Sequence, residues 1–402
     1  MSVSIPKINE SDIIESFTPV RESVRADILR YGDELERRAG LHESYNIDRE
    51  RALKGAESGS YEQYYYESQL NRQRFLTIAR DLNRSNSDDE IARLSGELTQ
   101  ASIAVFGKTD EHLAKKYADG ENGDDYMDVA QSVAKYLNEK YGKVFECLGF
   151  DGIDGMITAE DFASSVERVL RYMSRNIDQS WSEWSVARRN KGSLAVSSVN
   201  RTISVGIERV PMTPVQAKGL FAHEVLMHAG RALNGEKISD DLRTGLENYS
   251  NVEEGFGVLF EYAITGNIPA KNIERYVDVA NALGQLDGKP KTRKELLKIV
   301  TARDSNTNEK MPGDKRLSEE QLTDSIFERI NRIYRGTKGD NHIGVMTRDI
   351  LYQRGFVKIC KYIRSEMDKG KSINMIMDYA MTCKFDPTNE THVAKLSSLI
   401  NS

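Results

Sequence analysis

Apolar residues recur at intervals of three and four positions over most of the chain, and this spacing constrains the fold more than any other feature. It is clearest in four segments: RADILRYGDELERRAG, ESQLNRQRFLTIARDLNR, DEIARLSGELTQASIAVFG and TRDILYQRGFVKICKYIRSEM. Residues at these intervals lie on one face of an α-helix, so each segment predicts a helix with one buried and one solvated face. We therefore expect a mostly helical protein.

A segment rich in β-branched residues, between Trp184 and Val210, departs from this spacing. WSVARR, SLAVSSV and RTISVGIERV alternate polar and apolar side chains, a period typical of strands. They predict two or three strands in a small antiparallel or mixed sheet, with turns at residues 190–192 and near Asn200. The sheet leads directly into another helical segment, so the expected fold class is α+β, mostly helical, with the sheet next to that helix.

The chain has 402 residues, more than the roughly 250–300 at which a single hydrophobic core stops growing. We expect a flexible N-terminal arm over residues 1–20, a helical N-terminal region over residues 21–140, and a second domain with a helical C-terminal part over residues 141–402. Residues 302–317 are polar and contain Pro and Gly, which predicts a surface loop.

Charge and composition exclude several classes of partner. With 56 basic and 62 acidic residues the net charge is -6, so the chain lacks the positive field that binds nucleic acid. No apolar run reaches the roughly 18 residues of a membrane span, and the N-terminus lacks the apolar core of a signal peptide. The three cysteines are far apart and odd in number, as expected of reduced thiols. We expect a cytoplasmic protein with no membrane partner.

The string FDGIDGMITAEDF has the look of a calcium-binding loop, but its ligand positions are wrong. Aligned on Gly155, the first and third positions fall on Phe150 and Gly152, and the twelfth falls on Asp161 in place of the bidentate Glu. We interpret the string as a Gly-rich turn that ends at Thr158, the N-cap of the next helix.

The string His223–His228, H-E-V-L-M-H, carries the clearest chemical signal. In the commoner H-E-x-x-H, the two histidines lie about 40° apart around a helix and share one metal ion, while Glu acts on the bound water. Here the spacing is five. On an ideal α-helix such side chains diverge by about 140°, whereas a π-helical turn reduces the divergence to about 50°. If both imidazoles bind one ion, we predict a π-bulge or an overwound break between His223 and Ala229; the alternative is two packed, hydrogen-bonded rings.

A third ligand is expected from a second helix. A catalytic zinc site needs three protein ligands and an open position for water. Residues 252–257, V-E-E-G-F-G, place two carboxylates in an otherwise apolar segment, where their burial is destabilising without a cation. We predict Glu254 as the ligand. Glu253 is the alternative, or accepts a hydrogen bond from a ligand imidazole.

Together these strings resemble a known family, the microtubule-associated tyrosine carboxypeptidases and their prokaryotic relatives. The resemblance extends from about Tyr141 to Tyr362, and it rests on five pieces: Trp184 with Val186, NRTISV at 200–205, LFAHEVLMHAGRALNG, VEEGFGVLFEY, and TRDILYQRG at 347–355. It implies that residues 141–402 form a zinc-peptidase-like catalytic domain. In it His223, His228 and Glu254 would hold Zn²⁺ and Glu224 would be the general base. The chain departs from the family at Leu226, Met227 and Phe256, which bears on substrate choice and leaves the ligands intact.

The family resemblance also implies how the reaction proceeds. Zinc lowers the pKa of its water toward about 7, and Glu224 takes the proton and passes it to the leaving amine. The oxyanion needs a further donor; we predict Tyr352, then Arg348, both from the 347–355 string. The alternative is a packed Tyr and a solvated Arg.

Removal of a C-terminal residue also requires a cation for the terminal carboxylate. We predict Arg201 for this role, then Arg354. An extended peptide is expected to pair with the edge of strand 200–205. The expected function is a zinc metallocarboxypeptidase acting on the C-terminal tail of a peptide or protein. The alternatives are a zinc endopeptidase or aminopeptidase, and a non-catalytic regulatory protein with a vestigial site.

Overall fold

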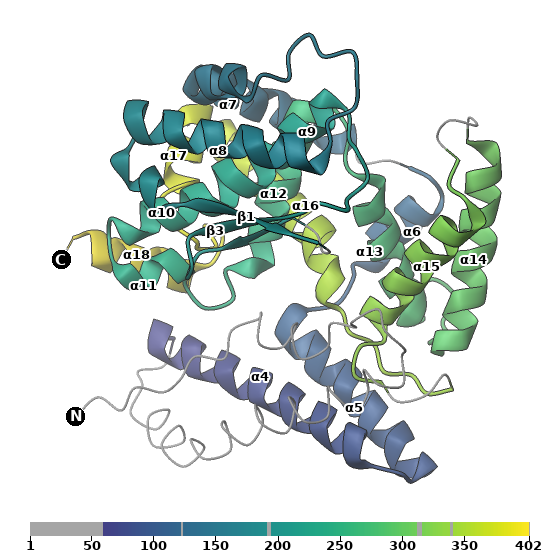
Figure 1. Ribbon diagram of the computed structural model, residues 1–402. Helices are drawn as coiled ribbons and strands as arrows, with labels where there is room; N and C mark the ends of the chain where they lie inside the picture. The colour runs from purple at the N-terminus through teal and green to yellow at the C-terminus, as the bar shows by residue number, and fades with distance from the viewer. Residues whose placement is uncertain (1–58, 122–123, 191–193, 312–315, 338–340, 402) are drawn as a thin grey trace. The chain divides into compact units, whose positions relative to one another are not determined.

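The computed structural model describes residues 59–121, 124–190, 194–311, 316–337 and 341–401 (Figure 1). The predicted arm over residues 1–20, and the helices expected before residue 59, lie outside the described residues. Within them the protein is mostly helical with one small sheet, as the apolar spacing predicts. No helix among the described residues is long and apolar enough to cross a membrane.

The chain divides into two compact units, and each is built from two separate stretches of sequence. The first lies within Met1–Asn122 and Lys271–Ile350, and the second within Gly123–Ala270 and Leu351–Ser402. The boundary predicted between residues 140 and 141 falls inside the helix α7 (Met127–Leu148). Helical periodicity alone does not reveal which distant helices share a core.

The first unit is entirely helical in its described part. Its elements are α4 (Tyr61–Arg84), α5 (Asp88–Phe106), α6 (Glu111–Ala118), α13 (Ala270–Ala282), α14 (Arg293–Lys310), α15 (Glu319–Ile333) and the 3-10 turn η5 (Arg348–Ile350). Tyr276, Leu296 and Ile330 are among the residues of a common apolar core. The surface loop predicted over residues 302–317 is wrong for residues 302–310, which continue α14. Thr292 and Glu295 form a capping box that starts this helix, and such a start sustains a polar helix.

The second unit contains the sheet and the remaining helices. They are η1 (Asp124–Tyr126), α7, α8 (Ala159–Asn176), η2 (Gln179–Glu183), β1 (Ser185–Arg189), β2 (Ala195–Ser197), β3 (Thr202–Gly206), α9 (Pro214–Phe221), η3 (Ala222–Ala229), α10 (Gly230–Glu236), α11 (Asp240–Thr244), α12 (Ser250–Thr265), α16 (Leu351–Asp368), α17 (Ile373–Ala380) and α18 (Glu390–Ile400). Thr158 caps α8 through a capping box with Asp161, as predicted.

The sheet is small and mixed, in the order β1-β3-β2. β1 runs parallel to β3 and β2 runs antiparallel to it, with Ile203 opposite both Val186 and Val196. α8 packs against β1 and β3 (Figure 1). η3 packs against β2, so the sheet lies next to the helix of the His223–His228 string. The predicted peptide pairing along strand 200–205 is wrong, because β3 is the central strand and both of its edges are occupied. Among the described residues β2 is an edge strand, and it is the strand that packs against η3.

Helix α12 packs against α9, η3 and α16. Its approach to α16 is so close that a Cβ on Gly255 would lie 2.0 Å from the carbonyl carbon of Gly355. Two facing glycines therefore allow the backbones of α12 and α16 to touch at the turn that carries Glu253 and Glu254.

Candidate metal centre

The two histidines lie on a π-helix, η3, which spans Ala222–Ala229 between the α-helices α9 and α10. Thr213 caps α9 and Pro214 occupies its first turn. The predicted π-helical distortion between His223 and Ala229 is confirmed. It brings the two imidazole rings to a centroid separation of 5.1 Å, which side chains diverging by about 140° would not reach.

Glu254 completes a group of three donors. Its Oε2 lies 3.9 Å from Nε2 of His223 and 3.9 Å from Nε2 of His228. One ligand atom from each residue lies within 4.8 Å of the others. Zinc bonds of about 2.0–2.2 Å place tetrahedral ligand atoms about 3.4 Å apart. The three donors are therefore close to the separations that one ion needs, and their chemistry suits zinc.

Glu261 and Gly257, both on α12, hold the ring of His223. Nδ1 of His223 donates to Oε2 of Glu261 at 3.3 Å, which leaves Nε2 directed toward Glu254. A Cβ on Gly257 would lie only 2.4 Å from Nε2 of His223. The imidazole thus occupies space that exists because residue 257 has no side chain.

The ring of His228 is held by Glu253. Nδ1 of His228 donates to Oε1 of Glu253 at 3.0 Å, and Oε2 of the same carboxylate is paired with Arg231. Lys384 is 3.7 Å from Oε1. Of the two neighbouring glutamates, Glu254 therefore faces both Nε2 atoms, while Glu253 is 3% exposed and orients an imidazole.

Carboxylates dominate the electrostatics around His223. Burial lowers the pKa of this imidazole, but hydrogen bonds to Glu254 and Glu261 outweigh burial and raise it to about 10. Burial also raises the pKa of Glu224, against the opposing influence of the two imidazoles. A partly buried carboxyl with a raised pKa is suited to accept and release a proton.

The charges of this cluster are unbalanced in favour of anions. Four carboxylates and two cations contribute: Glu224, Glu253, Glu254, Glu261, Arg231 and Lys384. Burial acts to raise the pKa of Glu253, yet Arg231 and Lys384 hold it at about 2, so this carboxylate stays ionised. Metal ligation requires both imidazoles to be neutral; in that form, with all four carboxylates ionised, the named side chains carry an excess of two negative charges. A divalent cation matches that excess.

Two of the other predicted site residues, Arg201 and Arg348, form ion pairs with acidic side chains outside this cluster. Arg201 is ion-paired with Glu236 and with Glu183, the latter at 3.2 Å. Arg348 belongs to η5 in the first unit, with Nη1 3.8 Å from Asp349.

Tyr352 and Arg354 lie on α16 in the second unit. Tyr352 packs against the apolar core three residues before Gly355, at which α16 crosses α12. The roles predicted for these two residues and for both arginines above stay predictions.

Sequence reasoning missed four residues that build the site: Gly257, Glu261, Arg231 and Lys384. Glu261 follows Glu254 by seven positions, two helical turns, so its place on the same face of α12 was readable from the sequence. Arg231 follows His228 by three positions and was readable in the same way. Lys384 lies far along the chain, and no local pattern connects it to the site.

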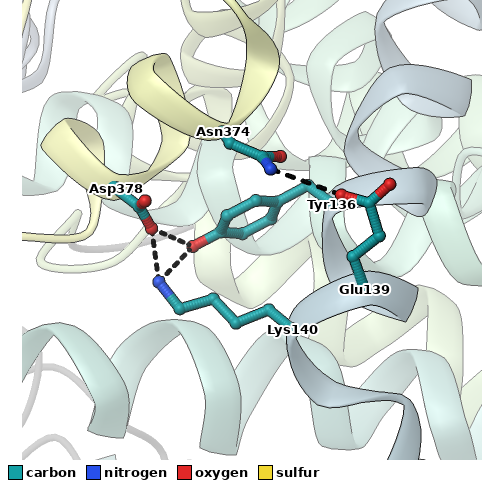
Figure 2. A pocket seen from close by; sticks show the side chains of 5 residues that line it. All are labelled: Tyr136, Glu139, Lys140, Asn374 and Asp378. Carbon is teal, nitrogen blue, oxygen red and sulfur yellow. Dashed lines mark hydrogen bonds and ion pairs between the residues drawn. The ribbon is translucent and has the colours of Figure 1, made fainter.

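A separate small pocket in the second unit is lined by residues of α7 and α17 (Figure 2). Its polar groups bond to one another. Asp378 accepts from the hydroxyl of Tyr136 at 3.2 Å and pairs with Lys140, while Asn374 donates to Glu139 at 3.3 Å. These bonds join α7 to α17, and we therefore interpret the pocket as part of the packing between two helices.

Comparison of the chain with protein-family models and with curated proteins found no match.

Proposed function

We propose that this protein is a cytoplasmic zinc-dependent peptidase, and specifically a metallocarboxypeptidase that removes the C-terminal residue of a peptide or protein tail. His223, His228 and Glu254 hold the zinc ion and Glu224 is the general base. The observation that supports the proposal is the π-helix η3, which places two imidazoles five positions apart beside one carboxylate. The resemblance to the microtubule-associated tyrosine carboxypeptidases points the same way.

Bound zinc supplies a water molecule of lowered pKa and a Lewis acid for the scissile carbonyl. Glu224 would take a proton from the attacking water and deliver it to the leaving amine as the peptide C–N bond breaks. Its burial beside the two imidazoles supports this role. Tyr352 is our proposed second donor to the oxyanion, and Arg354 our proposed partner of the terminal carboxylate.

A structural or vestigial metal site explains the three ligands but leaves Glu224 without a purpose. Two further carboxylates, the buried Glu253 and the partly buried Glu261, already orient the imidazoles. Glu224 is a fourth carboxylate, and we assign it to neither ring. A structural site does not require such a group, whereas a catalytic site requires a base.

One observation favours an endopeptidase as the second candidate. Arg201, our first candidate for binding a terminal carboxylate, is engaged by Glu183 and Glu236. An extended substrate pairing with β2 beside η3 needs no such cation, because main-chain hydrogen bonds would hold it.

The test is to compare wild type with Glu224→Gln by zinc analysis and by cleavage of a peptide library. We expect Glu224→Gln to retain zinc and to lose about 100- to 10,000-fold in kcat. Peptides with free and amidated C-termini separate the two candidates, since only an endopeptidase cleaves both at equal rates. Equal activity of wild type and Glu224→Gln would refute the proposed base.

A further inference from the structure

Arg231 is a fully buried cation, 0% exposed, one helical turn beyond His228. A guanidinium inside a protein is tolerated only when its charge and its donors are matched. Its contacts therefore identify what the side chain does.

The guanidinium has partners on its edge and on its face. Nη1 pairs with Oε2 of Glu253, Nε donates to the carbonyl of Cys383 at 2.8 Å, and Nη2 donates to the carbonyl of Phe385 at 2.6 Å. The guanidinium carbon Cζ lies over the ring of Phe256, 4.8 Å from its centroid, and so Arg231 is held in one orientation.

These contacts continue to the metal ligand. The second oxygen of Glu253, Oε1, accepts from Nδ1 of His228 at 3.0 Å, and Nε2 of that ring lies 3.9 Å from Glu254. Arg231, Glu253 and His228 thus form a linear series in which each member fixes the next.

We propose that Arg231 is a positioning residue of the metal centre: it fixes the carboxylate of Glu253, which orients the His228 imidazole, and it ties the zinc-binding helix to residues 383–385. The inference rests on the proposed function, because it presumes that His228 is a ligand. It assigns a role to the segment 383–385, whose two carbonyls hold the guanidinium. Lysine cannot replace Arg231, since an ammonium presents a point charge and lacks the planar fork that engages one carboxylate and two carbonyls together.

The experiment measures the zinc affinity of the full-length protein by competition with a chromophoric chelator. We expect Arg231→Lys to weaken zinc binding about 10- to 100-fold, the range typical for groups that orient a ligand imidazole. The matched control is Arg332→Lys, because Arg332 makes two bonds, of 2.6 and 2.7 Å, to Asp349 in the first unit. The control is expected to lose thermal stability and to keep its zinc affinity.

Glu253→Gln provides a second route if Arg231→Lys does not fold. It leaves the carbonyl partners of Arg231 in place and removes the negative charge that pairs with Arg231 and accepts from His228, so we expect a similar loss of zinc affinity. The double variant should bind zinc no more weakly than Glu253→Gln alone, since the two residues act in series.

Three results would overturn the inference: wild-type zinc affinity in Arg231→Lys, wild-type zinc affinity in Glu253→Gln, or multiplied losses in the double variant. A wild-type protein that binds no zinc would remove the proposed function as well. Zinc binding by wild type with no effect of these variants would remove the inference alone.

Discussion

The metal centre depends on a residue that has no side chain. A Cβ on Gly257 would lie 2.4 Å from Nε2 and 2.6 Å from Cδ2 of His223, closer than packed atoms approach. We expect Gly257→Ala to displace the ring and weaken zinc binding at least about 10-fold, because loss of ligand orientation has effects of this size. Competition with a chromophoric chelator measures the zinc affinity of this variant.

Gly96 in α5 provides the control for this substitution. A Cβ there meets nothing within 4 Å. Ala is a better helix former than Gly by about 1 kcal/mol, so Gly96→Ala should raise stability and leave zinc affinity unchanged. If Gly257→Ala also kept wild-type zinc affinity, His223 would not need the space described for it.

His392 is a buried histidine that the proposed reaction does not use. It is 0% exposed, and burial lowers its pKa to about 4, against the influence of Asp386. Its unfolded pKa is about 6.5, so the unfolded chain binds the proton more readily between these values. Stability is therefore full above pH 6.5 and falls as the pH drops toward 4, by about 1.4 kcal/mol per pH unit for one proton.

Urea unfolding at pH 6.5 and pH 5 measures this contribution. Between these values we expect wild type to lose about 2 kcal/mol more than His392→Gln does. The exposed His112 in α6 serves as a control, and His112→Gln should keep the wild-type pH dependence. An equal pH dependence in wild type and His392→Gln would show that His392 does not remain neutral in the fold.

At the scale of elements, the sequence predicted those features that depend on local spacing. The five-residue interval between His223 and His228 required a π-helix, and η3 is one. The third ligand was expected from a second helix, and Glu254 lies on α12. Thr158 was predicted as an N-cap because a Gly-rich turn ends there, and its capping box with Asp161 confirms the prediction.

Features that depend on distant contacts were not predictable in this way. Strand 200–205 was expected at an edge, but the order β1-β3-β2 places it in the centre, and strand order is not encoded in alternation. Residues 302–310 were expected to form a loop because they are polar, but they continue α14, which starts at the Thr292 capping box. Lys384 reaches Glu253 only through the folding of the chain beyond α17.

At the scale of the whole molecule, the candidate site is built entirely within one of two compact units. Its donors come from η3 and α12, and its support from α10 and residues 383–385, all within the second unit. A ligand that binds only the native site stabilises it by about 2.7 kcal/mol when its concentration is 100 times Kd. The first unit contributes none of the residues in this cluster.

Hydrogen exchange of the full-length protein, with and without zinc, tests this distribution. Opening of the second unit must release the ion, so we expect zinc to slow amide exchange in η3, α10 and α12 by up to about 100-fold, the factor that corresponds to 2.7 kcal/mol. Exchange in α14 and α15 of the first unit should change little, because no donor lies there. His228→Ala should abolish the zinc effect. Equal slowing in both units would show that they open as one, and no slowing in either would show that zinc does not bind the native site.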